Sequence, residues 1–265
     1  MNEKKEKMEK MEKIKKRIIY EEYEFPKLFT NFVERDYGIL YHNIKNINSY
    51  DSNHAVIFPE KISNLTRVLN EISIFYSKNL RQNANIYHPF VENYFIENAR
   101  ILKLCKYQLT INLDSRIMLL TEDNKIKKSK KLEIKHIRKW DRNVNDDINK
   151  ISGKEKYLQK VIKNSMKENN FLFIGYFMGE PVSLLSFHVS KHGCTRFDEI
   201  KTIEKHRNNG YAREMVSFAV EFHRKEKLPI AYQWPRNSTS ERITTEAGFR
   251  VAFTIPLGHA NHINF

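Results

Sequence analysis

Residues 197–212 read FDEIKTIEKHRNNGYA, and the last six, Arg207-Asn208-Asn209-Gly210-Tyr211-Ala212, decide how the rest of the chain is interpreted. Residues 197–203 are typical of a strand, and residues 211–224 space their apolar side chains as a helix does. A strand, a turn with one glycine and a helix N-terminus together predict an anion site, because the first amides of a helix have no partner within it. Gly210 lets the backbone come close to a bulky anion, and Arg207 and Arg213 add positive charge beside it.

The spacing of Arg207, Gly210 and Ala212 resembles the pyrophosphate-binding signature of the GNAT N-acetyltransferases, which bind acetyl-CoA. A second segment supports this resemblance, because Asn237 precedes Gly248-Phe249 at the spacing of the family and a strand-like run lies before it. The resemblance covers residues 132–265. It implies an α/β (α+β) fold with a GNAT-like, mixed but mostly antiparallel sheet that is flanked by helices.

The resemblance also implies the cosubstrate, acetyl-CoA, and the residues that bind it. In the family, the backbone at the end of the signature strand bonds the pantetheine arm as an added strand would, so the side chains there matter little. Asn237 has a structural interpretation too, as a helix N-cap, and it could satisfy both roles at once. The expected cofactor-binding residues are Thr202, Ile203, Arg207, Asn208, Asn209, Gly210, Tyr211, Ala212, Arg213 and Asn237.

Acyl transfer to an amine needs a base, because the amine must lose a proton to become a nucleophile. Relatives often place a carboxylate on the signature strand, where this chain has Asp198 and Glu199. Neighbours in a strand are expected to point to opposite faces, and Asp198 ranks first because it shares the parity of Thr202. An ordinary surface carboxylate, paired with Arg196 or Lys201, is an equally good interpretation of Asp198.

The general acid is a departure from the family, which often uses a tyrosine in the segment before the Gly-Phe pair to protonate the leaving thiolate. By spacing, that position is Thr244 in this chain, and a threonine hydroxyl cannot serve equivalently. The sequence does not choose among the substitutes, which are Tyr211, Tyr232 and His188.

Composition is consistent with a folded protein that binds an anion. The chain has 265 residues, a net charge of +14 and a pI of about 9.5, a balance that suits CoA, nucleic acid or an anionic membrane surface. The basic runs lack interleaved aromatic residues, which disfavours nucleic acid. Two cysteines and no Cys-His spacing predict no disulfide framework and no metal site. With neither a signal peptide nor a membrane-length apolar run, a cytoplasmic protein is expected.

The N-terminal half is predicted to repeat the C-terminal half in a degenerate form. Its expected order of strand, helix, strand, helix and strand matches that of 197–255, but Gly38 is its only glycine and the turn after the first of these strands carries Glu60 instead. The predicted organisation is a charged N-terminal helix at 1–18, a degenerate GNAT-like domain at 19–122, a basic linker at 123–131 and a GNAT acyltransferase domain at 132–265.

The sequence thus predicts an N-acetyltransferase that moves an acetyl group from acetyl-CoA to a primary amine. The alternative is a non-catalytic CoA-binding or scaffold protein of the same fold, favoured by Thr244 and by the degenerate half. The amine acceptor cannot be identified from the sequence, and a homodimer stays open.

Overall fold

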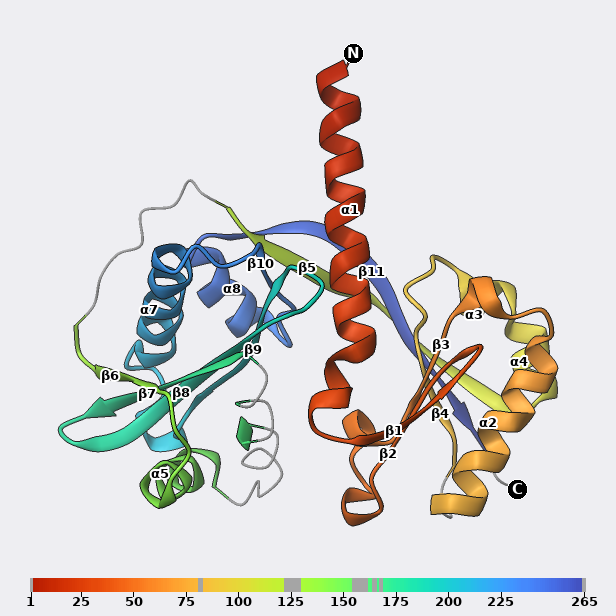
Figure 1. Cartoon of the computed structure of the whole chain (residues 1–265), viewed down its shortest axis with the longest axis horizontal. Coiled ribbons are helices and arrows are strands. Elements are labelled where there is room, and N and C mark those ends of the chain that lie inside the picture. The colour runs from red at the N-terminus through yellow and green to blue at the C-terminus, as the bar shows by residue number, and fades with distance from the viewer. Residues whose placement is uncertain are drawn as a thin grey trace. The chain divides into compact units, whose positions relative to one another are not determined.

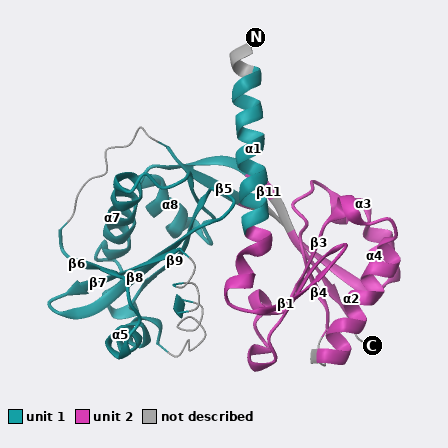
Figure 2. Ribbon diagram, in the orientation of Figure 1, with its two compact units in different colours: residues 1–21, 116–253 teal, residues 22–115, 254–265 magenta. Residues whose placement is uncertain are grey.

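The structure is a computed structural model that describes residues 2–80, 83–121, 130–153, 162–163, 166 and 169–263. The chain forms two compact units, which Figure 2 colours separately. Unit 1 combines residues 1–21 and 116–253, and unit 2 combines residues 22–115 and 254–265. Each unit has a largely antiparallel sheet with helices packed on it, so the predicted mixed α/β fold class is confirmed.

The signature strand β9 lies inside the sheet of unit 1, with a strand on each side. The order is β10-β9-β8-β7-β6, with the end of β5 (Tyr107–Leu120) beside β10, and all neighbours are antiparallel except the parallel pair β9 and β10. The sequence predicts a hairpin here, because two strand-like runs, 171–177 and 181–189, flank Met178-Gly179-Glu180. Met178 and Gly179 form its turn at φ values of +51° and +81°, as a tight hairpin turn requires. The strands are β6 (Glu133–Ile137), β7 (Asn170–Phe177), β8 (Glu180–Val189), β9 (Thr195–Thr202) and β10 (Ala231–Gln233).

Helices cover both faces of this sheet (Figure 1). On one face lies α7 (Tyr211–Lys225), whose apolar stripe packs on Phe173, Leu185 and Phe197. On the other face lies α5 (Arg142–Ser152), with Ile148 buried against Leu172 and Leu184. The sequence predicts one or two helices at 141–170, with Tyr157, Leu158, Val161 and Ile162 as apolar anchors. This segment is described only in part, and Tyr157, Leu158 and Val161 lie outside the described residues.

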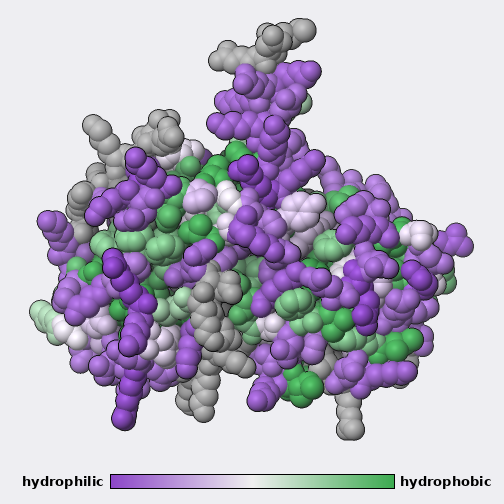
Figure 3. Space-filling view, in the orientation of Figure 1, coloured by the Kyte–Doolittle hydropathy of each residue, from purple (hydrophilic) through white to green (hydrophobic). Residues whose placement is uncertain are grey.

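Helix α1 (Asn2–Glu24) extends beyond the charged run predicted at 1–18. Figure 3 shows hydrophilic side chains along most of its exposed part. Near its C-terminal end, Ile18 is completely buried and Glu21 lies 3.7 Å from His188 of β8. Within the described chain, no helix combines the length and the apolar character needed to cross a membrane.

Unit 2 repeats the element order predicted for it. Its strands follow the order β1-β2-β3-β4-β11, and the parallel pair β3 and β4 is connected by α2 (Leu65–Leu80), as α7 connects β9 to β10. Leu69, Ile72 and Tyr76 of α2 are completely buried in its core. The strands are β1 (Asn31–Arg35), β2 (Gly38–His42), β3 (Ala55–Ile57) and β4 (Asn85–Tyr87), and two short helices follow, α3 (Tyr94–Glu97) and α4 (Ala99–Leu104).

The compact units cut across the predicted boundaries at 19–122 and 132–265. The reason is two strands of 14 residues each, β5 (Tyr107–Leu120) and β11 (Phe249–His262), which both have residues in both units. The end of β5 pairs with β10, and the end of β11 pairs with β4. Of the predicted linker 123–131, residues 123–129 lie outside the described residues.

Two buried histidines should make unit 2 sensitive to acid. Burial lowers the pKa of His54 to about 4, and burial together with nearby His259 does the same for His88. The Nδ1 atom of His88 accepts the Phe90 amide at 3.0 Å, a bond that protonation would remove. In the unfolded chain both imidazoles take up a proton near pH 6.5, whereas in the folded chain they stay neutral down to about pH 4. The free energy of unfolding therefore keeps its full value above about pH 6.5. Between about pH 6.5 and pH 4 it falls by about 1.4 kcal/mol per pH unit for each histidine.

Urea unfolding followed by circular dichroism at pH 7 and pH 5 checks this expectation. The midpoint should fall at pH 5, and His88→Gln should show a smaller fall because it removes one of the histidines that take up a proton on unfolding. Equal midpoints at both pH values would contradict the expectation.

Candidate functional site

The signature strand β9 separates from β10 along its second half. The two strands pair only from Thr195 to Phe197 of β9, which face Ala231 to Gln233 of β10. Residues 200–202 still pair with β8 on their other side. Beyond Phe197, the side of β9 that faces away from β8 therefore has no neighbouring strand among the described residues, and an extended ligand can add there as a strand does.

The loop after β9 turns its carbonyl groups inward. It begins with a 3₁₀ turn, η5 (Glu204–His206), and Asn208 then adopts φ +65°. The side-chain amide of Asn209 donates to the carbonyls of His206 and Arg207 at 3.1 and 3.2 Å. The Nζ atom of Lys131 donates to the Asn209 carbonyl at 3.0 Å. The carbonyl oxygens of His206, Arg207 and Asn209 are therefore hydrogen-bonded within the protein, which reduces their repulsion of an anion bound at this loop.

Gly210 begins α7 in the left-handed conformation that the sequence predicted for a turn glycine, with φ +82°. A Cβ atom added at Gly210 would meet no atom within 4 Å, so the glycine faces open space. The first backbone bond of the helix runs from the Glu214 amide to the Gly210 carbonyl. The amides of Tyr211, Ala212 and Arg213 precede that bond and are available to a ligand at the positive end of the helix dipole.

A cavity of about 850 Å³ lies over this helix terminus. Seven of the ten predicted cofactor-binding residues, the continuous run from Arg207 to Arg213, line the cavity. Thr202 and Asn237 also line it, whereas Ile203 does not. Its wall has five lysines and arginines and no carboxylate, so its field favours an anion. The other lining residues are Lys131, Ile200, Lys201, His206, Thr239, Ser240, Arg242 and Ile243.

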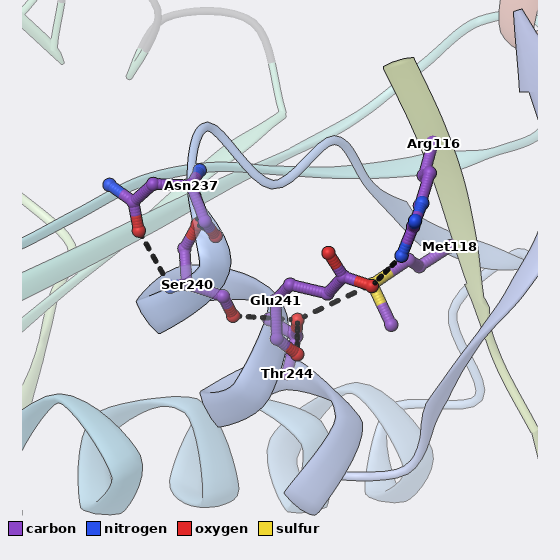
Figure 4. A network of polar contacts seen from close by, with 6 residues as sticks. All are labelled: Arg116, Met118, Asn237, Ser240, Glu241 and Thr244. Carbon is purple, nitrogen blue, oxygen red and sulfur yellow. Dashed lines mark hydrogen bonds and ion pairs between the residues drawn. The ribbon is translucent and has the colours of Figure 1, made fainter. Parts of the chain in front are cut away.

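A second helix N-terminus borders the same cavity, that of α8 (Ser238–Glu246). Asn237 is its N-cap, because its side-chain oxygen accepts the Ser240 amide at 2.9 Å, and the Ser240 hydroxyl completes a capping box (Figure 4). The N-cap interpretation of Asn237 is therefore correct. Its side-chain nitrogen points away from this bond and can still donate to a ligand, so both predicted roles are compatible.

Thr244 is buried and faces away from the cavity. Its hydroxyl lies against the Met118 sulfur at 3.6 Å and bonds the Ser240 and Glu241 carbonyls at 2.8 and 3.0 Å (Figure 4). Arg116 fixes the same helix through an ion pair with Glu241 at 2.8 Å. A hydroxyl held in this way cannot reach a thiolate in the cavity. Of the three substitutes, Tyr211 alone is in the cavity wall.

The prediction that Asp198 and Glu199 point to opposite faces is wrong. The β8–β9 register shifts between Leu185 and Phe187, so two residues of β9 stand opposite Ser186. Phe197 and Ile200 on either side both pack in the core beneath α7. Both carboxylates therefore point to the other face, because a β-bulge places its two central residues together. Asp198 was ranked first because side chains four residues apart in a regular strand share a face, as Asp198 and Thr202 would. The bulge between them interrupts this alternation.

Asp198 forms an ion pair with Arg196, in accordance with the structural interpretation of this residue. Both side chains are mostly buried, with 21% and 17% of their surface exposed. His188, directly opposite Arg196 in the register, is paired with Glu21 of α1. This face of β8 and β9 is thus lined by charged groups, and neither Asp198 nor Glu199 is in the wall of the cavity.

Sequence reasoning missed part of the cavity wall. Thr239 and Arg242 come from the first two turns of α8, and Lys131 comes from a run that was interpreted as linker. A weak signal existed for α8, since residues after an N-cap lie at a helix N-terminus. Nothing in the local sequence distinguishes Lys131 from the lysines before it.

The corresponding turn of unit 2 differs from the signature loop. Asn64 caps α2 by accepting the Arg67 amide at 3.0 Å. The small cavity there, of about 260 Å³, is lined by acidic residues, Glu34, Asp36 and Glu71, as well as basic ones. A mixed wall and a capped helix disfavour a phosphate at this position.

Known structures share this fold. The chain is similar to a GCN5-related N-acetyltransferase from Kribbella flavida, with a TM-score of 0.66 and 14% identity over 94% of this chain and 95% of that one. A functionally unknown conserved protein from Staphylococcus epidermidis aligns with a TM-score of 0.58 and 11% identity over 89% and 95% of the two chains. A tandem GNAT protein from the clavulanic acid biosynthesis pathway aligns at 0.57 and 6% identity, over 80% and 74%.

At these identities the similarity shows the fold alone, which is that of the GNAT N-acetyltransferases, as the resemblance implied. The sequence itself matches no protein-family model and no curated protein.

Proposed function

We propose that the protein is an N-acetyltransferase that transfers the acetyl group of acetyl-CoA to a primary amine. The observation that carries the proposal is the cavity beside the open edge of β9. It joins a strand edge that suits the pantetheine arm to a helix N-terminus and basic side chains that suit the phosphates; of the five, Arg213 is also ion-paired with Glu246.

In the proposed reaction the amine nitrogen attacks the thioester carbonyl, a C–N bond forms and the C–S bond breaks. One proton leaves the amine and one proton reaches the thiolate. Glu199 is the proposed base. Asp198 is assigned a different role, that of holding Arg196 in an ion pair. Tyr211, in the cavity wall, is the proposed donor to the thiolate, with water as its substitute.

Saturating acetyl-CoA should raise the melting temperature. A ligand at about 100 times its dissociation constant adds about 2.7 kcal/mol to the free energy of unfolding, since it binds only the folded chain. Differential scanning fluorimetry with millimolar acetyl-CoA measures this, with pantetheine, which lacks the phosphates, as the control. An unchanged melting temperature would remove the basis of the proposal.

The second candidate function is CoA binding without turnover, which the inward-facing Thr244 favours. A steady-state assay for released thiol, with a panel of primary amines as acceptors, separates the two. An enzyme releases thiol in proportion to time and acceptor, whereas a binding protein shows the thermal shift and no release.

Unit 2 should not bind a second CoA. Its turn before α2 leads into a capped helix, and the adjoining cavity has three carboxylates that offset its three cations, so it lacks the positive field that favours phosphates. Isothermal titration calorimetry should give one CoA per chain. Two equivalent sites per chain would contradict this expectation.

A further inference from the structure

The backbone amides of Lys131 and Leu132 are hydrogen-bonded to Glu214 in the first turn of α7. The Glu214 carboxylate accepts the Lys131 amide at 3.1 Å and the Leu132 amide at 2.9 Å. Glu214 itself is only 5% exposed. A buried carboxylate that accepts two backbone amides holds its partners firmly, because removing either bond would leave buried charge unsatisfied.

The packing of the Leu132 side chain also holds this segment in place, in addition to the hydrogen bonds of its backbone. It packs in the core beneath α7, and a Cβ atom added at Gly175 would come within 2.9 Å of it and 2.7 Å of Met215. The glycine in β7 therefore makes room for the Leu132 side chain. The chain entering β6 is held at both its amides and its side chain, so the position of Lys131 is set by the fold.

The ammonium of Lys131 is thereby brought to the signature loop, where it donates to the Asn209 carbonyl and lines the cavity. An ammonium has three donors, and Asn209 uses one. Two remain for a phosphate at the adjacent helix N-terminus. The bond to Asn209 also removes a carbonyl oxygen that would otherwise repel such a phosphate.

We infer that Lys131 is a phosphate contact of the acyl-donor site, and that Glu214 is the positioning residue that holds it there. This inference rests on the proposed function, since it takes CoA as the ligand. Lys131 thus adds to the site a cation that lies outside the signature, in the segment just before β6.

If Glu214 holds Lys131 in place, the expected effect of a Glu214 substitution on CoA affinity is reversed. A carboxylate in the first turn of a helix repels a phosphate bound there, so its simple neutralisation would strengthen CoA binding. If Glu214 acts through Lys131, Glu214→Gln weakens CoA binding instead, since a glutamine oxygen can retain the bond to one amide while its NH₂ group cannot accept the other.

Calorimetric titration of full-length variants with CoA tests the inference, and Lys131→Met is matched by Lys130→Met. Lys130 is an exposed neighbour of equal charge that does not line the cavity. Lys131→Met should weaken CoA binding about fivefold, a usual size for an exposed charge pair, and Lys130→Met less than about twofold. Titration with dephospho-CoA identifies the group: a loss confined to CoA indicates the 3′-phosphate, and an equal loss with both indicates the diphosphate.

Glu214→Gln should weaken CoA binding in the wild-type background and have no further effect in Lys131→Met, because one residue acts through the other. Equal affinities of Lys131→Met and Lys130→Met would overturn the inference while leaving the proposed function intact. Tighter or unchanged binding by Glu214→Gln would overturn the role of Glu214. A wild-type chain that binds no CoA would overturn both the inference and the proposed function.

Discussion

Gly210→Asp should abolish CoA binding, with an affinity at least about 100-fold lower, or about 2.7 kcal/mol. The added carboxylate would enter the open space in front of the helix N-terminus, where the proposed phosphate lies. Two like charges about 4 Å apart repel by about 4 kcal/mol at an effective dielectric constant of about 20. Aspartate is tolerated at φ +82° better than most residues, so the fold should persist.

Two controls make this experiment specific. Gly210→Asn has the size of Asp without its charge, and its loss of affinity should be much smaller. Gly179→Asp introduces the same charge at nearly the same φ, +81°, also with no atom within 4 Å, but in the β7–β8 turn. Calorimetry should give Gly179→Asp the affinity of the wild type. A Gly210→Asp variant that binds CoA normally would exclude this cavity as the phosphate site.

Glu199→Gln should lower turnover by roughly 10²–10⁴, the usual contribution of a general base. The β-bulge points Glu199 and Asp198 to the same face of the sheet, and Arg196 binds Asp198. Asp198→Asn should therefore have the smaller effect, through a less firmly held Arg196. CoA affinity should change little in either variant, because the proposed phosphate site lies at Gly210 and the helix N-terminus.

The pH dependence of thiol release distinguishes loss of the base from loss of structure. If Glu199 is the base, the Glu199→Gln variant should recover rate as the pH rises, since a larger share of the amine is then already neutral. A larger loss in Asp198→Asn than in Glu199→Gln would return the role of base to Asp198. Small and equal losses would favour a binding protein or an acceptor that arrives neutral.

The sequence was sufficient to predict the elements around the signature because their signals are local. Gly210 at a turn, the apolar spacing of α7 and the hairpin at Gly179 each depend on residues close by in the chain. The capping role of Asn237 was available for the same reason, since an N-cap bonds an amide three residues further on.

The errors come from pairing between distant residues. The parity argument for Asp198 assumed a regular strand, and the bulge depends on how β9 pairs with β8, which the sequence of β9 does not reveal. Lys131 lies at the cavity because Glu214, far along the chain, accepts its amide. The strands β1 and β2 were not predicted as such, and β11 was not predicted to reach β4.

The long strands β5 and β11 have a consequence for biosynthesis. Unit 2 needs residues 254–265, whose strand pairs with β4, and these residues are synthesised only after residues 116–253 of unit 1. Most domains fold from the N-terminus while the chain is still being made. Here residues 22–115 lack the strand that pairs with Ile86 until residues 254–262 have been synthesised. A nascent chain that has not reached those residues exposes the edge of β4, and chaperones that recognise such edges have that interval in which to bind it.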